Sequence, residues 1–255
     1  MNRLKVAAMV SVGSHPASGR PCRAPLDARA VEMGLGLDGA ELQMVHAGDP
    51  DNPALRDYLG MGLPTLTVLQ QPAQGDSIPA LLQWARREQP ELLLLGCRAN
   101  GGEDSGMAPF LLAQALGYAV VVDAVQIEVR DRELEIVQAL PRGQRRLIRA
   151  ELPCVVAVGA AAPAPRQSAY GPARRGRIAI EPVEPAVDIE AMHWEIQPAR
   201  KRPKRLKVVK AKTAAERFMA ATAVQGGGKT VRGVSPTEAA RVIYDYLKEE
   251  ELVTR

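Results

Sequence analysis

The first 125 residues alternate between two hydrophobic periods, one typical of strands and one typical of helices. Apolar runs predict strands at residues 6–12, 41–46, 65–69 and 91–96. Apolar residues at helical spacing predict helices at residues 26–37, 52–60, 77–89 and 107–116. Ser77 is placed to cap the third of these helices. The last strand, ELLLLG, is apolar throughout, as expected in the middle of a parallel sheet. This alternation indicates a parallel sheet with helices on both faces.

From residue 119 the alternation of strand-like and helix-like hydrophobic periods ends. Four strands with short turns between them are predicted at residues 120–129, 133–139, 145–151 and 154–158. Antiparallel strands therefore extend or cap the parallel sheet. Residues 159–165 are small and proline-rich, and residues 166–212 are charged and proline-containing, which is typical of an extended arm without a core of its own.

Two helices are predicted to close the chain, and each begins with a capping box. Thr213 and Glu216 form the first box, and Ser235 and Glu238 form the second, with a proline at the first helical position. The last helix carries an apolar stripe made of Ala239, Val242, Ile243, Tyr246 and Leu247. We expect this stripe to dock on the first domain or on a partner. The predicted domains are residues 1–165 (α/β), 166–212 (a basic arm) and 213–255 (helices).

Composition narrows the class of protein. The chain has 255 residues, a net charge of +4, and only 2 Phe, 2 Trp and 5 Tyr, so stacking on single-stranded nucleic acid is a poor match. Eight Lys and Arg lie within residues 200–212. This run lacks aromatic residues and helical amphipathicity, so we expect a solvated arm on an acidic partner, with nucleic-acid binding as an alternative.

The three cysteines and three histidines are scattered, without a CxxC pair or zinc-ligand spacing. A reducing, cytoplasmic location is the simplest interpretation. The first apolar run is broken by Gly13 and Pro16, which favours a strand over a signal peptide, and no run approaches the length of a membrane helix.

The loop after the ELLLLG strand is the best candidate for a binding site. Open α/β sheets bind ligands at the carboxyl ends of their strands, and helix N-termini offer N–H groups to anions. Gly101, Gly102 and Gly106 would let the backbone approach a phosphate-bearing nucleotide, although an ordinary connecting loop is an equal alternative and Glu103 and Asp104 repel anions. The spacing does not match GxGxxG. A second glycine-rich segment, residues 225–230, fails the P-loop pattern because Ala223 stands at the first glycine position.

Several segments, taken in order, resemble the β subunits of electron transfer flavoproteins. Residues 94–96 read LLG, and the acidic loop that follows ends in Ser105 and Gly106. Residues 132–134 read REL, and residues 152–156 read LPCVV, followed by Pro165 and Arg166. Upstream, residues 24–27 read APLD, which resembles the family's Asn-Pro-Phe-Asp/Glu. The similarity runs with gaps over nearly the whole chain.

The resemblance implies a Rossmann-like α/β fold, AMP as a structural ligand, and an α subunit that holds most of the FAD. It implies an electron carrier rather than an enzyme, which accepts electrons from a flavin-dependent dehydrogenase and passes them to a membrane quinone oxidoreductase. Residues 159–170 would be the loop that docks on the dehydrogenase, and the flavin would face His15, Pro16 and Leu26. By position, the nucleotide contacts would be Met9, Ala24, Pro25, Leu26, Asp27, Ala47 and residues 98–106, among them Arg98, Glu103, Asp104, Ser105 and Gly106.

The chain also departs from the family pattern. About fifteen residues of a hairpin are missing before Pro25, Leu26 replaces the aromatic residue, and Ala162 stands where the docking loop usually has a leucine. An alanine cannot fill a partner's apolar pocket, so we expect a different dehydrogenase partner. The alternative function is a stand-alone, universal-stress-like module that binds an adenine nucleotide. The sequence leaves open whether AMP or a second FAD occupies the nucleotide site.

Overall fold

The computed structural model describes residues 3–72, 75–102, 104–130, 132–189, 191–195, 197, 213–222 and 231–249. The chain divides into two units, Met1–Glu195 and Ile196–Arg255. The predicted boundary at residue 165 therefore falls inside the first unit. The basic run at residues 200–212 and the glycine-rich segment at residues 225–230 lie outside the described residues.

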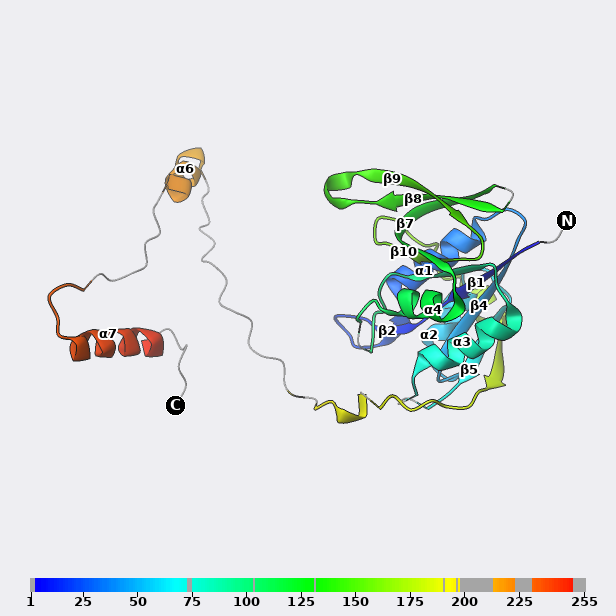
Figure 1. Ribbon diagram of the computed structural model, residues 1–255, viewed down its shortest axis with the longest axis horizontal. Coiled ribbons are helices and arrows are strands. Elements are labelled where there is room, and N and C mark those ends of the chain that lie inside the picture. The colour runs from blue at the N-terminus through cyan, green and yellow to red at the C-terminus, as the bar shows by residue number, and fades with distance from the viewer. Residues whose placement is uncertain are drawn as a thin grey trace. The chain divides into compact units, whose positions relative to one another are not determined.

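The first unit is an α/β structure (Figure 1). Its strands are β1 (Leu4–Met9), β2 (Val12–Ser14), β3 (Pro21–Arg23), β4 (Ala40–Gly48), β5 (Thr65–Gln70), β6 (Leu92–Gly96), β7 (Ala119–Arg130), β8 (Glu133–Ala139), β9 (Arg145–Glu151), β10 (Cys154–Val158) and β11 (Arg177–Pro182). Its helices are α1 (Pro25–Leu35), α2 (Ala54–Leu59), α3 (Ser77–Glu88), α4 (Ala108–Leu116) and α5 (Tyr170–Arg175), with 3-10 turns η1 (Pro141–Gly143) and η2 (Ala191–His193). Nine strands form one sheet in the order β11-β5-β4-β1-β6-β10-β7-β8-β9, and β2 and β3 form a separate hairpin.

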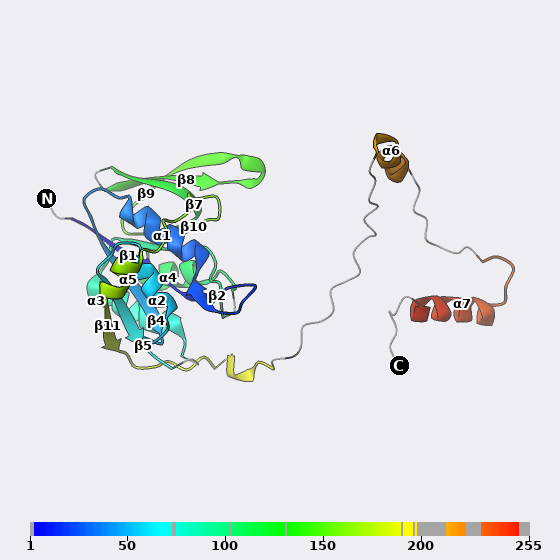
Figure 2. The ribbon, with the colours of Figure 1, turned by 180° about the vertical axis from the view of Figure 1, so that it is seen from behind.

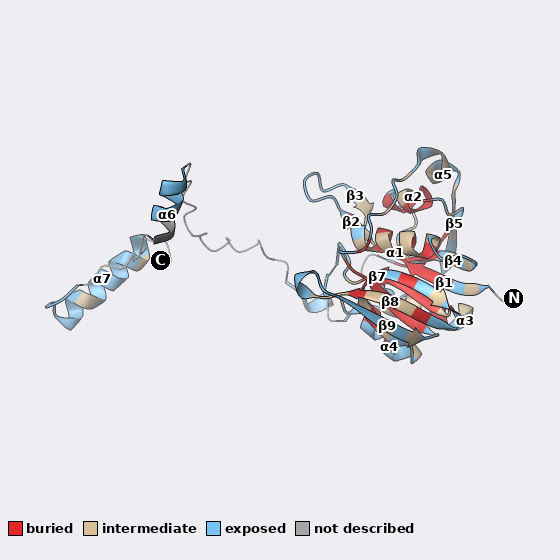
Figure 3. Cartoon of the chain, turned by 90° about the horizontal axis from the view of Figure 1, so that it is seen from above, coloured by how far each residue is buried: buried red, intermediate tan, exposed pale blue. Residues whose placement is uncertain are grey.

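Alternate residues of the central strands point to opposite faces, and helices cover both. Even-numbered β1 residues such as Ala8 pack with α1 and α2, whereas Ala7 and Met9 pack with α3 and α4. In Figure 1 α3 and α4 lie in front of the sheet, and Figure 2 shows α1 and α2 from the other side. All five residues of β6 are buried. Figure 3 shows that the buried residues gather in the strands of the sheet and on the helix faces turned toward it. The predicted α/β class, with its mostly parallel sheet, is confirmed.

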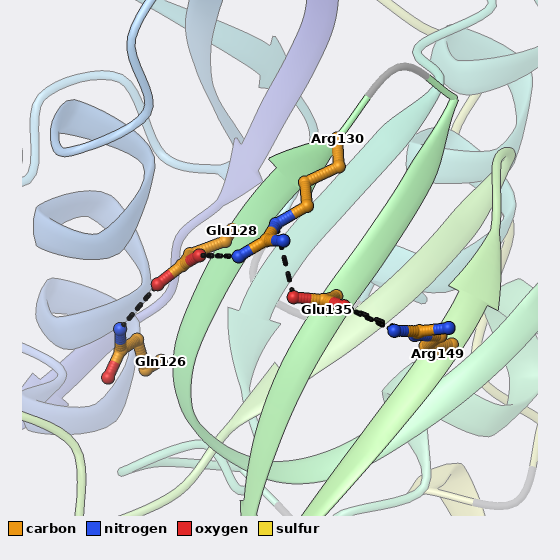
Figure 4. A network of polar contacts seen from close by, with 5 residues as sticks. All are labelled: Gln126, Glu128, Arg130, Glu135 and Arg149. Carbon is orange, nitrogen blue, oxygen red and sulfur yellow. Dashed lines mark hydrogen bonds and ion pairs between the residues drawn. The ribbon is translucent and has the colours of Figure 1, made fainter.

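The antiparallel extension is built by β7, β8 and β9. The first half of β7 runs parallel to β10, and its second half pairs antiparallel with β8. One face of the extension packs on α1 through Ile127, Leu134 and Ile136. The other face is solvated and carries a network of ion pairs and hydrogen bonds (Figure 4) that links Gln126, Glu128, Arg130, Glu135 and Arg149.

The structure corrects the sequence-based expectations at three places. β10, predicted among the antiparallel strands, is a buried parallel strand between β6 and β7. Residues 170–175 and 177–182, predicted in the extended arm, form α5 and β11, and β11 pairs parallel with β5 at the edge of the sheet. Asp76 rather than Ser77 caps α3, because its Oδ1 accepts a hydrogen bond of 2.9 Å from the N–H of Ile78.

The described part of the second unit contains α6 (Ala214–Thr222) and α7 (Pro236–Glu249). Both predicted capping boxes are present: the N–H of Glu216 donates to Thr213 Oγ1 at 3.2 Å, and the N–H of Glu238 donates to Ser235 Oγ at 3.3 Å. The reciprocal bonds from the N–H groups of Thr213 and Ser235 to the two glutamates are 3.2 and 3.0 Å. Within the described ranges, no helix combines the length and the apolar character needed to cross a membrane.

Candidate functional site

The predicted site residues gather at the carboxyl edge of the parallel sheet. β1, β4 and β6 run parallel side by side, so their carboxyl ends lie at one edge. Met9 ends β1, Ala47 lies near the end of β4, and the loop from Cys97 to Gly106 follows β6. The N-terminus of α1, with Ala24 and Asp27, lies at this same edge because it touches Gly96. The structure thus brings the main predicted contacts to one place.

The start of α1 is tied to this edge by the carboxylate of Asp27. Its Oδ1 accepts a hydrogen bond of 2.8 Å from the N–H of Gly96, and its Oδ2 accepts bonds of 2.8 and 2.5 Å from the N–H and the hydroxyl of Ser11. Only glycine fits at position 96, because a Cβ there would lie 2.6 Å from Asp27 Oδ1 and 2.7 Å from the Leu26 Cβ. Asp27 therefore joins α1 to the end of β6 and to Ser11, which lies between β1 and β2, and its oxygens are bonded within the protein.

Burial dominates the electrostatics of this tie. It raises the pKa of Asp27 from 3.8 to about 6, although the hydrogen bonds from Ser11 and Gly96 act in the opposite direction. Tyr58, from α2, is fully buried beside it: its hydroxyl donates to the Ser11 carbonyl at 2.8 Å and accepts from the Ala24 N–H at 2.9 Å. Burial also raises the pKa of the Tyr58 phenol well above its ordinary value. Tyr58 is thus neutral and acts as a fixed bridge.

The loop after β6 contains two glycines in the left-handed region of backbone conformation. Gly102 and Gly106 have positive φ angles of 64° and 73°. A Cβ at Gly106 would lie 2.9 Å from the carbonyl oxygen of Cys97, whereas nothing lies within 4 Å of one at Gly102. The loop leads into the N-terminus of α4, where unpaired N–H groups favour an anion.

The charges of this loop partly cancel. The Arg98 guanidinium donates to the Asp104 carbonyl at 2.8 Å and lies 3.3 Å from the Asp104 carboxylate. The repulsion expected between Asp104 and an anionic ligand is therefore reduced. The hydroxyl of Ser105 accepts a bond of 3.4 Å from the N–H of Met107, just before α4. Glu103 lies outside the described residues.

A short hairpin, β2–β3, follows β1 beside this loop. The sequence predicted that about fifteen residues of the family's hairpin are missing before Pro25, and β2–β3 is a short hairpin at this place. Asn100 packs on Gly13, where a Cβ would lie 2.4 Å from its Nδ2. His15, expected near the flavin, is exposed in the turn, where its Nδ1 is 3.3 Å from the N–H groups of Ala17 and Ser18. Leu26 is half-buried and Pro25 is exposed, so both present part of their surface to the outside.

Sequence reasoning missed several residues that shape this edge. Ser11 and Tyr58 complete the buried network around Asp27, and nothing in their local sequence signals this because they meet α1 only in three dimensions. His46, near the end of β4, is also buried, and its Nδ1 lies 2.8 Å from the Val10 carbonyl. Burial lowers the pKa of His46, so it is neutral. A single histidine in an apolar strand was the available signal.

The segment after β10, expected to be the docking loop, is fastened to the outer side of α1. Arg166 forms two bonds with the Glu32 carboxylate, Nε–Oε2 at 2.8 Å and Nη2–Oε1 at 2.9 Å, and its N–H donates to Oε2 at 3.0 Å. These bonds lower the pKa of Glu32. A guanidinium N–H of Arg29 donates to the Ala162 carbonyl. Ala162 itself is buried, at 4% exposure, so its side chain is not offered to a partner.

Comparisons with known proteins identify the family of this chain. The model of the electron transfer flavoprotein domain family matches residues 23–186, well over half of the chain. A protein from Chromohalobacter salexigens, named electron transfer flavoprotein subunit beta, is 46% identical over 256 residues, covering 98% of this chain and 96% of that protein.

The chain belongs to the electron transfer flavoprotein family, among its β subunits. The family match begins at Arg23, at the end of the hairpin, and therefore includes the N-terminus of α1, the loop after β6 and the segment fastened to α1. It ends at Ala186, beyond β11. For an electron transfer flavoprotein β subunit, the carboxyl edge described above is the natural candidate site, and its residues suit binding rather than bond-making chemistry.

Proposed function

We propose that this chain is the β subunit of a heterodimeric electron transfer flavoprotein and acts as an electron carrier in the cytoplasm. The observation that carries the proposal is the 46% identity, over nearly the full length of both chains, to a protein named as such a subunit. The three cysteines are all free, which agrees with a reducing compartment. On this proposal the chain has no reaction of its own. The alternative of a stand-alone nucleotide-binding module is not favoured.

The redox chemistry belongs to FAD, which accepts and donates the electrons and is held mainly by the α subunit. This chain contributes one wall, for which the proposed residues are the half-buried Leu26 and the exposed His15. The buried Nη1 of Arg23, three residues before Leu26, has no hydrogen-bond partner within the described structure. A donor of this kind fits an anionic or carbonyl-bearing neighbour at this edge.

AMP is the proposed ligand of the loop after β6. The residues fit an adenylate, because Gly102 and Gly106 have backbone conformations that favour glycine, and Arg98 offsets the negative charge of Asp104. Met9 is buried in the core, so only its backbone is available to a nucleotide. Asp27 would act indirectly, by holding the start of α1 in place.

The electron donor is proposed to be a flavin-dependent dehydrogenase that docks at residues 159–170, and the acceptor a membrane quinone oxidoreductase. The exposed apolar stripe of α7 and the basic run at residues 200–212 are proposed to wrap the α subunit. Ile243 is 61% exposed and Tyr246 is 43% exposed, which supports a partner for this stripe.

The nucleotide part of the proposal is tested by acid-releasing the ligand from the purified heterodimer and by comparing two variants. We expect about one AMP per dimer. Gly106→Val places a side chain against the Cys97 carbonyl and should reduce the retained AMP at least about tenfold, whereas Gln83→Ala, on exposed α3 surface, should change nothing. A heterodimer that contains FAD and no adenylate would contradict the AMP assignment. Two FAD per dimer would show that FAD, rather than AMP, occupies the nucleotide site.

A further inference from the structure

His46 is a buried polar side chain of which only one ring nitrogen has a partner in the described structure. It lies near the end of β4 and is 7% exposed. Its Nδ1 is 2.8 Å from the carbonyl oxygen of Val10. Because a carbonyl oxygen can only accept a hydrogen bond, Nδ1 carries the proton of this bond. In the neutral ring, Nε2 is then an acceptor with a free lone pair.

Burial keeps the ring of His46 in its neutral form. Desolvation of the charged ring lowers the pKa of His46, although the bond with Val10 and the nearby carboxylate of Asp49 act in the opposite direction. At neutral pH, Nε2 of His46 is therefore a fixed hydrogen-bond acceptor rather than a donor.

The free nitrogen of His46 is directed toward the carboxyl end of β4. Residues two apart on a strand share a face, and a Cβ at Gly48 would lie 2.7 Å from His46 Nε2. Gly48 has a φ angle of 153°, so glycine both permits this backbone conformation and leaves room for the ring. Two side-chain atoms of the described residues are sealed from solvent without a hydrogen bond, Arg23 Nη1 and Gln71 Oε1, and His46 Nε2 is not one of them. The lone pair of Nε2 is therefore open to a ligand.

This acceptor lies between two predicted contacts of the nucleotide site. Val10, which holds the ring, directly follows Met9, and Ala47 directly follows His46. β4, β1 and β6 are neighbours in the sheet, and two strand spacings amount to about 10 Å. The phosphate and the base lie at opposite ends of a nucleoside monophosphate. A nucleotide with its phosphate at the loop after β6 can therefore extend its base to the end of β4.

We propose that His46 selects the base of the bound nucleotide by accepting, at Nε2, a hydrogen bond from the 6-amino group of adenine. The inference rests on the proposed function, in which the loop after β6 binds AMP, and it names the residue that distinguishes the base. Adenine has an amino donor at position 6, whereas guanine and hypoxanthine have a carbonyl oxygen there. That oxygen would face another acceptor, and both would be left desolvated without a partner. The nearby Asp49 carboxylate would also repel it.

The first test changes the ligand and leaves the chain as it is. The heterodimer is reassembled with FAD and an equimolar mixture of AMP and IMP, in which a carbonyl oxygen replaces the 6-amino group. The retained nucleotides are released with acid and separated by chromatography. We expect AMP in at least about tenfold excess over IMP, because IMP leaves the acceptor of His46 unpaired.

Three variants locate the selection. His46→Phe keeps a buried ring but removes both nitrogens, so the ratio of AMP to IMP should fall toward one. His46→Gln can donate to the Val10 carbonyl and keeps an acceptor, so it should retain part of the preference. Gln43→Ala, at an exposed position of the same strand, should leave the ratio unchanged. In a mixture of AMP and 2′-deoxy-AMP, none of the three should change the ratio, because His46 does not contact the ribose.

The proposal is overturned if the native heterodimer retains AMP and IMP alike, a result that does not depend on the folding of any variant. It is also overturned if His46→Phe and Gln43→Ala give the same ratio of AMP to IMP. A change in the ratio of AMP to 2′-deoxy-AMP in His46→Phe would overturn it too, since Nε2 would then contact the ribose. Failure of the proposed function is distinguishable, because no FAD-containing heterodimer would assemble, or the assembled one would retain no nucleotide.

Discussion

Two helices of this chain have similar first turns and similar apolar stripes, but different surroundings. α1 and α7 both begin with proline in the first turn, both have an acidic residue there, Asp27 in one and Glu238 in the other, and both carry an apolar stripe. In α1 the stripe is covered by the sheet, and Val31 has no exposed surface. In α7 the corresponding stripe is exposed, with Val242 at 38%.

The difference shows that an amphipathic pattern predicts a helix and its apolar face, but not the surface that covers that face. The first unit supplies the cover for α1 from its own strands. Within the second unit, the described residues supply no cover for α7, and the proposal above assigns that cover to the α subunit. The predictions below contrast the two helices, beginning with the largest effect.

Introducing a charge on each apolar stripe should have very different consequences. Val31→Asp places an unpaired carboxylate in the core and should lower the free energy of unfolding by at least about 4 kcal/mol. Val242→Asp should change it by less than about 0.5 kcal/mol, yet weaken assembly with the α subunit. Denaturant unfolding of the full chain, followed by circular dichroism, measures the free energy of unfolding of each variant. If Val242→Asp destabilised the first unit as Val31→Asp does, α7 would be docked on its own chain.

The acidic residues of the two first turns should respond to pH with opposite sign. Burial raises the pKa of Asp27 from 3.8 to about 6, so the folded state keeps a proton that the unfolded chain loses. The stabilisation from Asp27 is therefore complete below pH 3.8 and is lost as the pH rises through about 6, by about 3 kcal/mol in all. The measurement compares the unfolding free energies of the native chain and Asp27→Asn at pH 4 and pH 7. Parallel pH profiles of the two proteins would contradict the assignment.

The pKa of Glu238 is shifted in the opposite direction to that of Asp27. Hydrogen bonds from the N–H and hydroxyl of Ser235 lower the pKa of this carboxylate from 4.5. Its contribution to helix capping is present above pH 4.5 and is lost as the pH falls through the folded-state value. The helical circular dichroism of Glu238→Gln should therefore vary less with acidification than that of the native chain. An equal loss of helix in both would show that the cap is not the group that titrates.

The exposed side of α1 should matter least to stability. The Glu32–Arg166 pair is well formed at 2.8 Å, but the Arg166 side chain is 49% exposed and the pair is accessible to salt. Glu32→Gln should therefore lower the free energy of unfolding by no more than about 1 kcal/mol, with a smaller difference at high salt. Unfolding in low and high salt measures this. A loss of several kcal/mol would mean that the pair is effectively buried.

The sequence predicts most of the fold because its elements are strongly periodic. The apolar run of β6 and the helical spacing of α1 are visible locally, and both elements form close to the predicted positions. β11 was missed because only Ile178 and Ile180 mark it within a charged segment, and its pairing with β5 depends on contacts distant in sequence. β10 was assigned to the wrong kind of pairing for the same reason.

The sequence predicts where the candidate site lies, but not the contacts that hold it together. The position of a glycine-containing loop after a buried strand predicted the edge of the sheet, and the resemblance supplied the residues. The buried bonds from Ser11 and Gly96 to Asp27 could not be predicted, because each joins segments that meet only after folding. Nor could the inward position of Ala162, which depends on the bond from Arg29.

The central claim is that this chain is one half of a flavin-containing heterodimer. It is tested most directly by the visible absorbance and size-exclusion elution of the purified chain, alone and after co-expression with its α subunit. We predict a colourless chain when it is alone, and a yellow heterodimer with about one FAD when the α subunit is present. A chain that elutes alone from the co-expressed mixture, without flavin, would contradict the account.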